Sequence, residues 1–230
     1  MKTIISFFLI LSMGLSLMAQ SFAPRMLSFS AKKISYITLN DGTEIEGYFK
    51  SPKYKKGLIK EFTMVNANTN AKTKYLAEDI ASMRLVPSDY GKLLATSEAT
   101  SSIQKMEDTD MNQLKRDFIY FERAQLPNKK GTFVLLQLVN PGFDSKIKVY
   151  DDPYAAETGG IAVGGIQATG GNLKSYYLVR EGQAFKITKG KYKQEFDDIF
   201  GTCSYLAENF EKFKWNDFAK HVVAYTENCQ

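Results

Sequence analysis

Hydrophobic and polar residues alternate with a period of two between residues 33 and 86. This alternation is typical of strands that bury one face. It predicts five short strands, at residues 33–39, 44–49, 58–65, 72–76 and 80–86. Asn40-Asp41-Gly42 predicts a tight hairpin between the first two strands. Residues 77–79 leave room for one helical turn, and Pro87 ends the fifth strand.

Residues 88–116 break this pattern, because they are polar and have few periodic apolar positions. We expect a linker there, with one short helix near residues 110–115. Alternation then resumes and predicts strands at residues 118–124, 132–139, 146–150, 174–180 and 184–187. The last two of these strands flank the turn sequence Glu181-Gly182-Gln183 and are expected to form a hairpin.

The period changes to 3.6 after residue 190, which predicts helices. The final apolar stripe consists of Phe218, Val222, Tyr225 and Cys229. Cys203 lies near the start of an earlier stripe, and Cys229 lies at the end of the last one. Two antiparallel helices would bring these two cysteines together.

These segments predict an α+β fold that is mainly β. Its parts are an N-terminal small β-barrel, a polar linker, a second antiparallel β-sheet with a glycine-rich loop at residues 157–172, and a helical C-terminal unit with one disulfide. The expected boundaries are residues 30–87, 88–116, 117–190 and 191–230.

The first part resembles a small SH3-like or Sm-like barrel in its strand lengths and turns. The resemblance rests on residues 38–43 (Thr-Leu-Asn-Asp-Gly-Thr), Gly47 and residues 79–84 (Asp-Ile-Ala-Ser-Met-Arg). Sm-like barrels commonly bind RNA, but the apolar leader at residues 1–19 indicates export, and an exported copy has no obvious RNA to bind. We therefore carry over the fold and expect no nucleic-acid partner.

Residues 1–19 have the pattern of a secretory signal peptide. Lys2 supplies the positive charge, an apolar run follows at residues 4–18, and Ala19 is a small residue at the cut. The run is short for a membrane span, which needs about 20 apolar residues. We expect cleavage after Ala19 or Ser21, a periplasmic or secreted protein, and no stable membrane span after cleavage. The alternative is an uncleaved membrane anchor.

Charge and cysteine content fit an exported chain. Loss of Lys2 lowers the formal net charge from +5 to +4, and acidic and basic residues are interspersed. Such a charge favours solubility more than binding to nucleic acid or lipid. Cys203 and Cys229 are the only cysteines, and in an oxidising compartment an even pair predicts a disulfide. The alternative is two free thiols, one of them reactive.

The C-terminal sequence supports the same view. Its marks are residues 176–180 (Tyr-Tyr-Leu-Val-Arg), 199–203 (Ile-Phe-Gly-Thr-Cys) and 225–229 (Tyr-Thr-Glu-Asn-Cys). This tail resembles one that recurs in uncharacterised signal-peptide proteins of Bacteroidota-type bacteria. Because that family has no established activity, the resemblance implies export and cysteine pairing alone.

The sequence carries no catalytic or metal-binding motif. His221 is the only histidine, so any Ser or Cys triad would have to use it as the base; we interpret it as structural or surface-exposed. The acidic clusters at residues 107–110, 151–152 and 197–198 lack the spacing of a calcium loop. We expect no catalytic residue, no metal and no cofactor.

Glycine doublets at residues 159–160, 164–165 and 170–171 lack the Lys and Ser or Thr of a phosphate-binding loop. They predict a long hairpin loop, and the functional alternative is a loop that contacts a partner or membrane surface.

One basic and aromatic segment is a candidate ligand-binding patch, consisting of Tyr48, Lys53, Tyr54, Lys55 and Lys56. Such a patch can hold a polyanion or a sugar by charge and stacking. The alternative is that these lysines protect an edge strand from aggregation. We expect a non-catalytic protein of the cell envelope that binds a protein or glycan surface or has a structural role. The alternative is a periplasmic or secreted hydrolase that uses paired carboxylates.

Overall fold

The computed structural model describes residues 21–101, 111–127, 131–155, 161–163, 166–169 and 175–229. The expected signal peptide, the acidic cluster at residues 107–110 and the three glycine doublets lie outside the described residues. Among the described helices, none is long and apolar enough to cross a membrane.

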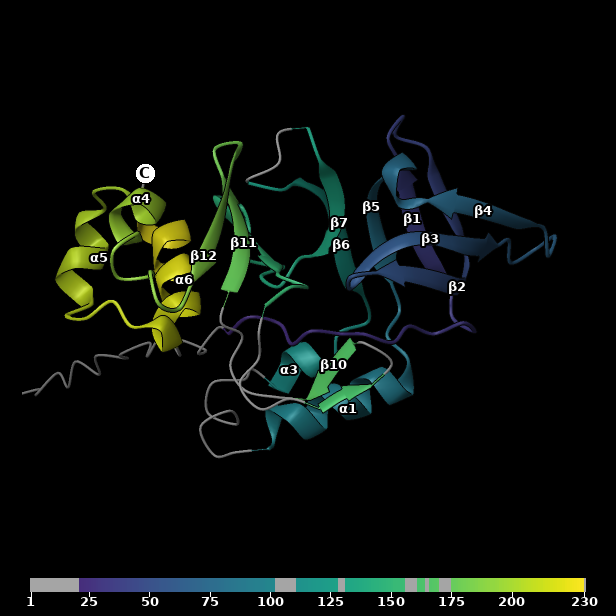
Figure 1. Ribbon diagram of the computed structural model, residues 1–230, viewed down its shortest axis with the longest axis horizontal. Coiled ribbons are helices and arrows are strands. Elements are labelled where there is room, and N and C mark those ends of the chain that lie inside the picture. Colours follow the sequence, from purple (N-terminus) through teal and green to yellow (C-terminus); the bar gives the residue numbers. More distant parts are fainter. Residues whose placement is uncertain are drawn as a thin grey trace, which may run out of the picture.

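A curled seven-stranded antiparallel sheet forms a half-barrel at one end of the molecule (Figure 1). Its strand order is β4-β3-β2-β1-β5-β6-β7. The strands are β1 (Ser35–Leu39), β2 (Glu44–Lys55), β3 (Leu58–Val65), β4 (Lys72–Leu76), β5 (Ile80–Leu85), β6 (Ile119–Gln125) and β7 (Phe133–Gln137). A 3₁₀ turn, η1 (Ala77–Asp79), precedes β5. The five strands and the single turn predicted for the N-terminal part are confirmed.

The half-barrel has its own core, because alternate residues of each strand point to its inner face. Ile37, Phe62 and Met83 are fully or almost fully buried there. The hairpin predicted at Asn40-Asp41-Gly42 joins β1 to β2, with Gly42 at a positive φ of 88°.

A second sheet of three strands continues from the first. It consists of β8 (Ile147–Asp151), β11 (Ser175–Arg180) and β12 (Gln183–Thr188), in the order β12-β11-β8. Val139 N donates to Val149 O at 2.8 Å just beyond the end of β7, and Leu138 forms an isolated bridge with Tyr150. The two sheets are therefore joined edge to edge through these bonds.

The division between the sheets differs from the expected one. We expected the strands at residues 118–124 and 132–139 to belong to the second sheet. They correspond to β6 and β7, and β6 pairs with β5 of the half-barrel, with Glu122 opposite Ser82. Since β1 occupies only one edge of β5, the other edge is open to β6, and the half-barrel extends by two strands.

The expected linker also differs, because it contains the helix α1 (Asp89–Ala99) besides the short α3 (Met111–Leu114). Ser88 caps α1 by accepting a hydrogen bond from Gly91 N at 2.9 Å. The buried face of α1 consists of Gly91, Ala95 and Ala99. These residues are small, so the helix lacks the large apolar stripe that sequence patterns detect.

The glycine-rich segment forms a hairpin in its described part. β9 (Ile161–Val163) pairs antiparallel with β10 (Ile166–Thr169), and this hairpin lies beside α1 (Figure 1).

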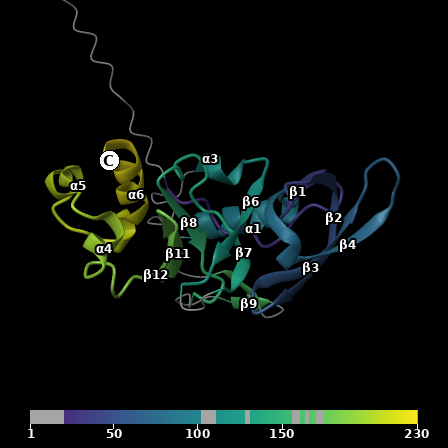
Figure 2. The ribbon, with the colours of Figure 1, turned by 90° about the horizontal axis from the view of Figure 1, so that it is seen from above.

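Helices cover the second sheet at the opposite end of the molecule (Figure 2). They are α4 (Phe196–Phe200), α5 (Ser204–Asn209), the 3₁₀ turn η2 (Trp215–Asp217) and α6 (Phe218–Asn228). Phe218 and Val222 of α6 pack in one core with Leu178 of β11. The predicted Cys203–Cys229 disulfide is confirmed, with a Cα–Cα distance of 5.7 Å. It links the N-cap of α5 to the C-cap of α6.

Residues 22–30 form an extended strap that contacts both cores. At one end, the Phe22 ring lies 5.1 Å from the ring of Phe218. At the other, the Phe29 ring lies 5.6 Å from that of Phe121 in the half-barrel. The strap runs along the lower side of both sheets (Figure 1), and Ala23 N donates to Val139 O at 2.6 Å. It therefore connects the two hydrophobic cores.

Candidate functional site

The candidate site begins at the tip of the β2–β3 hairpin. The basic segment lies at the end of β2, which runs beyond its predicted end at residue 49, and there Tyr54 pairs with Ile59 and Lys55 with Leu58. Lys56 and Gly57 have φ values of 52° and 77°. Two successive left-handed residues form a two-residue turn of type I′, so the tip has a defined shape.

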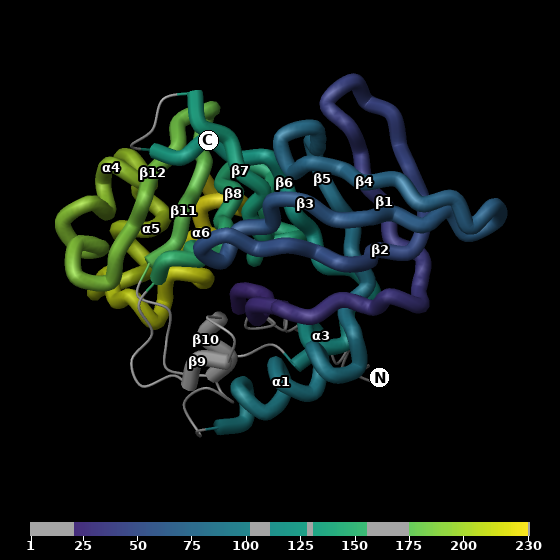
Figure 3. The backbone as a smooth tube through the Cα atoms, turned by 45° about the vertical axis from the view of Figure 1, so that its right-hand side comes forward, coloured from purple at the N-terminus to yellow at the C-terminus, as the bar shows by residue number. Residues whose placement is uncertain are grey.

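The tip is seated against the loop that follows β8. A Cβ added to Gly57 would lie 3.0 Å from Cβ of Pro153 and 3.3 Å from its carbonyl oxygen. Only a glycine fits this contact without movement of the loop. Figure 3 shows the β2–β3 hairpin reaching the second sheet. The hairpin tip and the loop at residues 152–155 are therefore in contact.

The five predicted binding residues do not form one patch. Tyr48 lies roughly 15–20 Å from Tyr54 along β2, given the rise of a strand, and Lys50 Nζ lies 6.0 Å from the centroid of its ring. Lys53 is neutralised by Glu61, 2.7 Å away, and Glu61 also binds Lys74 of β4 at 2.7 Å. Tyr48 and Lys53 thus belong to the outer face of the half-barrel.

Tyr54, Lys55 and Lys56 remain together at the tip. Both lysines are exposed, and neither forms an ion pair with a described residue. Tyr154, on the loop after β8, is 44% exposed, and Tyr54 is 36% exposed. We call Tyr54, Lys55, Lys56 and Tyr154 the tip surface.

A small pocket opens beside Tyr54, with a volume of about 30 Å³. This is enough for about two water molecules and too little for a sugar ring. Its polar lining comes from Arg25, Tyr54, Gln137 and Asp151, and the rest of its wall is largely apolar. A ligand larger than water would have to lie across the tip surface rather than inside this pocket.

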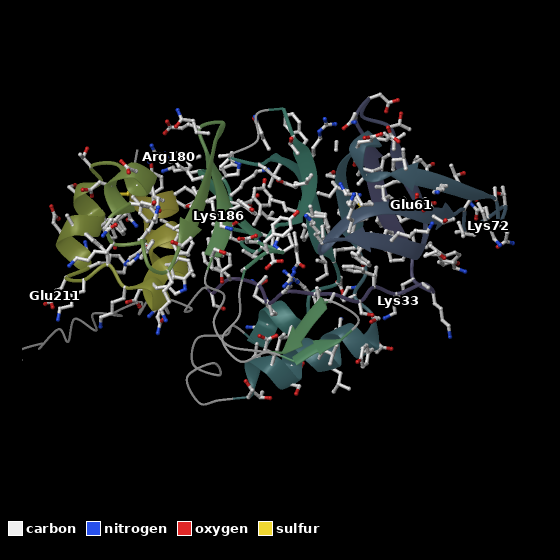
Figure 4. All side chains as sticks on the ribbon, in the orientation of Figure 1. Lys33, Glu61, Lys72, Arg180, Lys186 and Glu211 are labelled. Atoms are coloured by element: carbon white, nitrogen blue, oxygen red, sulfur yellow. A yellow bond between two sulfur atoms is a disulfide. The ribbon has the colours of Figure 1, made fainter. Side chains whose placement is uncertain are left out.

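Ion pairs hold the loop behind the tip surface. Arg25 Nε of the strap lies 2.9 Å from Asp151 Oδ2, with the two side chains 12% and 6% exposed. Asp152 is fully buried and accepts hydrogen bonds from Ser175 Oγ at 2.6 Å and from Tyr154 N at 2.9 Å. Lys186, labelled in Figure 4, reaches Asp152 Oδ2 at 2.7 Å. These contacts fix the backbone that carries Tyr154.

The tyrosines of this region are neutral at physiological pH. Burial raises the pKa of Tyr54 to about 12. Burial and the nearby Asp152 carboxylate raise the pKa of Tyr154 and of Tyr177. Each phenol therefore keeps its proton, and the partly exposed Tyr54 and Tyr154 add uncharged aromatic surface near two lysine charges.

His221 lies in the core of the C-terminal unit and has no exposed surface. Its Nδ1 is 2.5 Å from the Tyr192 hydroxyl. Of the two interpretations offered for His221, structural or surface-exposed, its burial favours the structural one. Among the described residues, no three His, Cys, Asp or Glu side chains are placed to hold a metal ion.

Sequence reasoning missed Arg25 and Tyr154. Residues 151–152 stood out only as an acidic pair, although the following Pro153-Tyr154 was a signal for an aromatic residue held on a turn. The role of Arg25 could not be predicted from a local pattern, because its ion-pair partner Asp151 lies 126 positions away in the sequence.

Comparison of the chain with known protein families, with curated proteins and with solved structures finds no match.

Proposed function

We propose that the protein is an exported, non-catalytic binding module of the cell envelope that contacts its partner through the tip surface. The observation that carries this proposal is the pair of partly exposed tyrosines, Tyr54 at the end of β2 and Tyr154 on the loop after β8, together with two exposed lysines that form no ion pair with a described residue. Tyrosine supplies contact area at low entropic cost, and a rigid surface loses less conformational freedom on binding.

Export is supported by the apolar leader at residues 4–18 and by the Cys203–Cys229 disulfide. Disulfides persist in oxidising compartments and are rare in the cytosol.

Binding is favoured over the hydrolase alternative. A carboxylate pair for glycoside hydrolysis needs one carboxylic acid that keeps its proton. Asp151 is paired with Arg25, and Asp152 is paired with Lys186. Both carboxylates are engaged in ion pairs that hold the loop after β8, so this acidic pair does not support the hydrolase alternative.

The test is sedimentation of the purified protein with envelope fragments of its own bacterium. The variant Lys55→Gln/Lys56→Asn removes two charges, and asparagine tolerates the left-handed turn at residue 56. The control Lys212→Gln/Lys214→Gln removes two charges beside Glu211, at the far end of the molecule (Figure 4). We expect the tip variant to bind at least fivefold more weakly and the control to bind as the wild type does. Equal binding by both variants would contradict the proposal.

A further inference from the structure

We propose that the tip surface binds an acidic polysaccharide, with sugar rings stacked on Tyr54 and Tyr154 and with sugar carboxylates paired to Lys55 and Lys56. This inference rests on the proposed function and names the chemical class of its ligand.

The charge of the surface points to an anionic ligand. The described carboxylates of β3 and of residues 151–155 are compensated by cations. Glu61 binds Lys53 and Lys74, Asp151 binds Arg25, and Asp152 binds Lys186. Lys55 and Lys56 have no ion-pair partner among the described residues, so they add positive charge to the tip surface, which attracts anions and orients them on approach.

The two tyrosines point to a sugar as the carrier of that charge. A pyranose ring has an apolar C–H face, which packs on an aromatic ring, and a polar rim, which hydrogen-bonds to a phenol hydroxyl. Because burial raises their pKa values, both phenols stay protonated and do not repel an anionic ligand. A fixed backbone also favours stacking, and the backbone N–H of Tyr154 donates to the buried Asp152.

The shape of the site favours a chain over a single sugar. The pocket of about 30 Å³ beside Tyr54 does not admit a sugar ring. The tip surface lies outside it, on the hairpin turn and the loop after β8. An extended polysaccharide can cross both elements and contact both tyrosines.

A protein partner fits this surface less well. Protein interfaces are depleted of lysine at their centre, and a stable one buries roughly 1,600 Å² in total. The tip surface instead has two adjacent lysines next to its two tyrosines.

The test measures affinity by calorimetry for three acidic polysaccharides, polygalacturonate, alginate and hyaluronate, with dextran as the neutral glycan. The wild type is expected to bind at least one acidic polymer and to bind dextran at least tenfold more weakly. Lys55→Gln/Lys56→Asn should lower that affinity about tenfold, Tyr154→Ser should lower it at least fivefold, and Lys212→Gln/Lys214→Gln should leave it unchanged. Far-ultraviolet circular dichroism of each variant establishes that it is folded.

Binding to none of the three acidic polymers would overturn the inference. So would binding that the Tyr154→Ser variant retains in full, because charge alone would then explain it. Envelope fragments distinguish this failure from failure of the proposed function. If periodate treatment leaves tip-dependent sedimentation intact and protease treatment abolishes it, the partner is a protein and only the glycan inference is wrong. If no tip-dependent sedimentation occurs, the proposed function is wrong.

Discussion

The Tyr192 hydroxyl lies 2.5 Å from Nδ1 of His221, inside the aromatic core of the C-terminal unit. Phe210 is the ring nearest to the imidazole, with 4.4 Å between the ring centroids. Burial, which Asp217 opposes and Lys220 reinforces, lowers the pKa of His221 to about 4. The folded protein therefore holds this imidazole in its neutral form.

This relationship predicts a loss of stability in mild acid. In the unfolded chain the His221 pKa returns to about 6.5, so below that pH the unfolded state binds a proton that the folded state does not bind. The destabilisation caused by this proton uptake is absent above pH 6.5 and grows as the pH falls towards 4. The unfolding free energy therefore falls by at most about 1.4 kcal/mol per pH unit on account of His221.

Urea unfolding at pH 7.5, 6.0 and 4.5 measures this effect. We expect His221→Gln to be less stable than the wild type at pH 7.5 but to lose less stability on acidification. An equal loss in both proteins would show that other groups cause the acid sensitivity.

Alanine substitution should destabilise the protein more at Gly57, in the hairpin tip, than at Gly182, although the two glycines have similar φ values. Gly57 and Gly182 have φ values of 77° and 76°, so alanine strains both turns by about 1 kcal/mol. A Cβ at Gly182 meets nothing within 4 Å, whereas a Cβ at Gly57 meets Pro153 at 3.0 Å. Gly57→Ala should therefore cost more unfolding free energy than Gly182→Ala, by about 1 kcal/mol or more.

Equal costs in urea unfolding would mean that the tip does not rest on Pro153. Lys56→Asn provides a second check on the turn. Since asparagine adopts the left-handed conformation more readily than lysine, this variant should be as stable as the wild type or more stable.

The strap predicts that Phe22 stabilises the C-terminal core. Its ring packs against Tyr176 and Phe218, each 5.1 Å away between centroids. Because Phe22 is only half-buried, we expect Phe22→Ala to cost about 2 kcal/mol, below the range for a fully buried phenylalanine. Tyr90→Ala is a suitable control, since Tyr90 is 61% exposed, and should change stability by less than about 0.5 kcal/mol. Equal effects of the two variants would show that the strap adds nothing to the core.

Removal of the Cys203–Cys229 disulfide should destabilise the protein more than Phe22→Ala does. Closing a loop with a sequence separation of 26 contributes about 3 kcal/mol in the chain-entropy model. Cys203→Ser/Cys229→Ser should lower the unfolding free energy by about this amount. An unchanged urea midpoint would mean that the helical unit is held by packing alone.

Local patterns predicted the local parts of the fold. β3, β4 and η1 have the predicted bounds, because alternation and turn residues mark both ends of each element. α1 escaped prediction because its buried residues, Gly91, Ala95 and Ala99, are too small to produce an apolar stripe. The division between the sheets was misplaced because strand pairing is non-local, and nothing in the sequence of β6 states that its partner is β5.

Only the part of the candidate site that is contiguous in the sequence was predicted. Tyr54, Lys55 and Lys56 are contiguous, so their basic and aromatic character was visible in the sequence. Tyr48 belonged to the same segment, but the strand between it and Tyr54 separates them. Tyr154 joins the site only through the contact between Gly57 and Pro153, which brings together residues 96 positions apart.

The most direct test of the central claim is the binding isotherm of the purified protein on envelope fragments, measured for the wild type, Lys55→Gln/Lys56→Asn and Lys212→Gln/Lys214→Gln. We expect saturable binding that weakens at least fivefold in the tip variant and is unchanged in the control. Binding that is equal in all three proteins, or absent from the wild type, would contradict it.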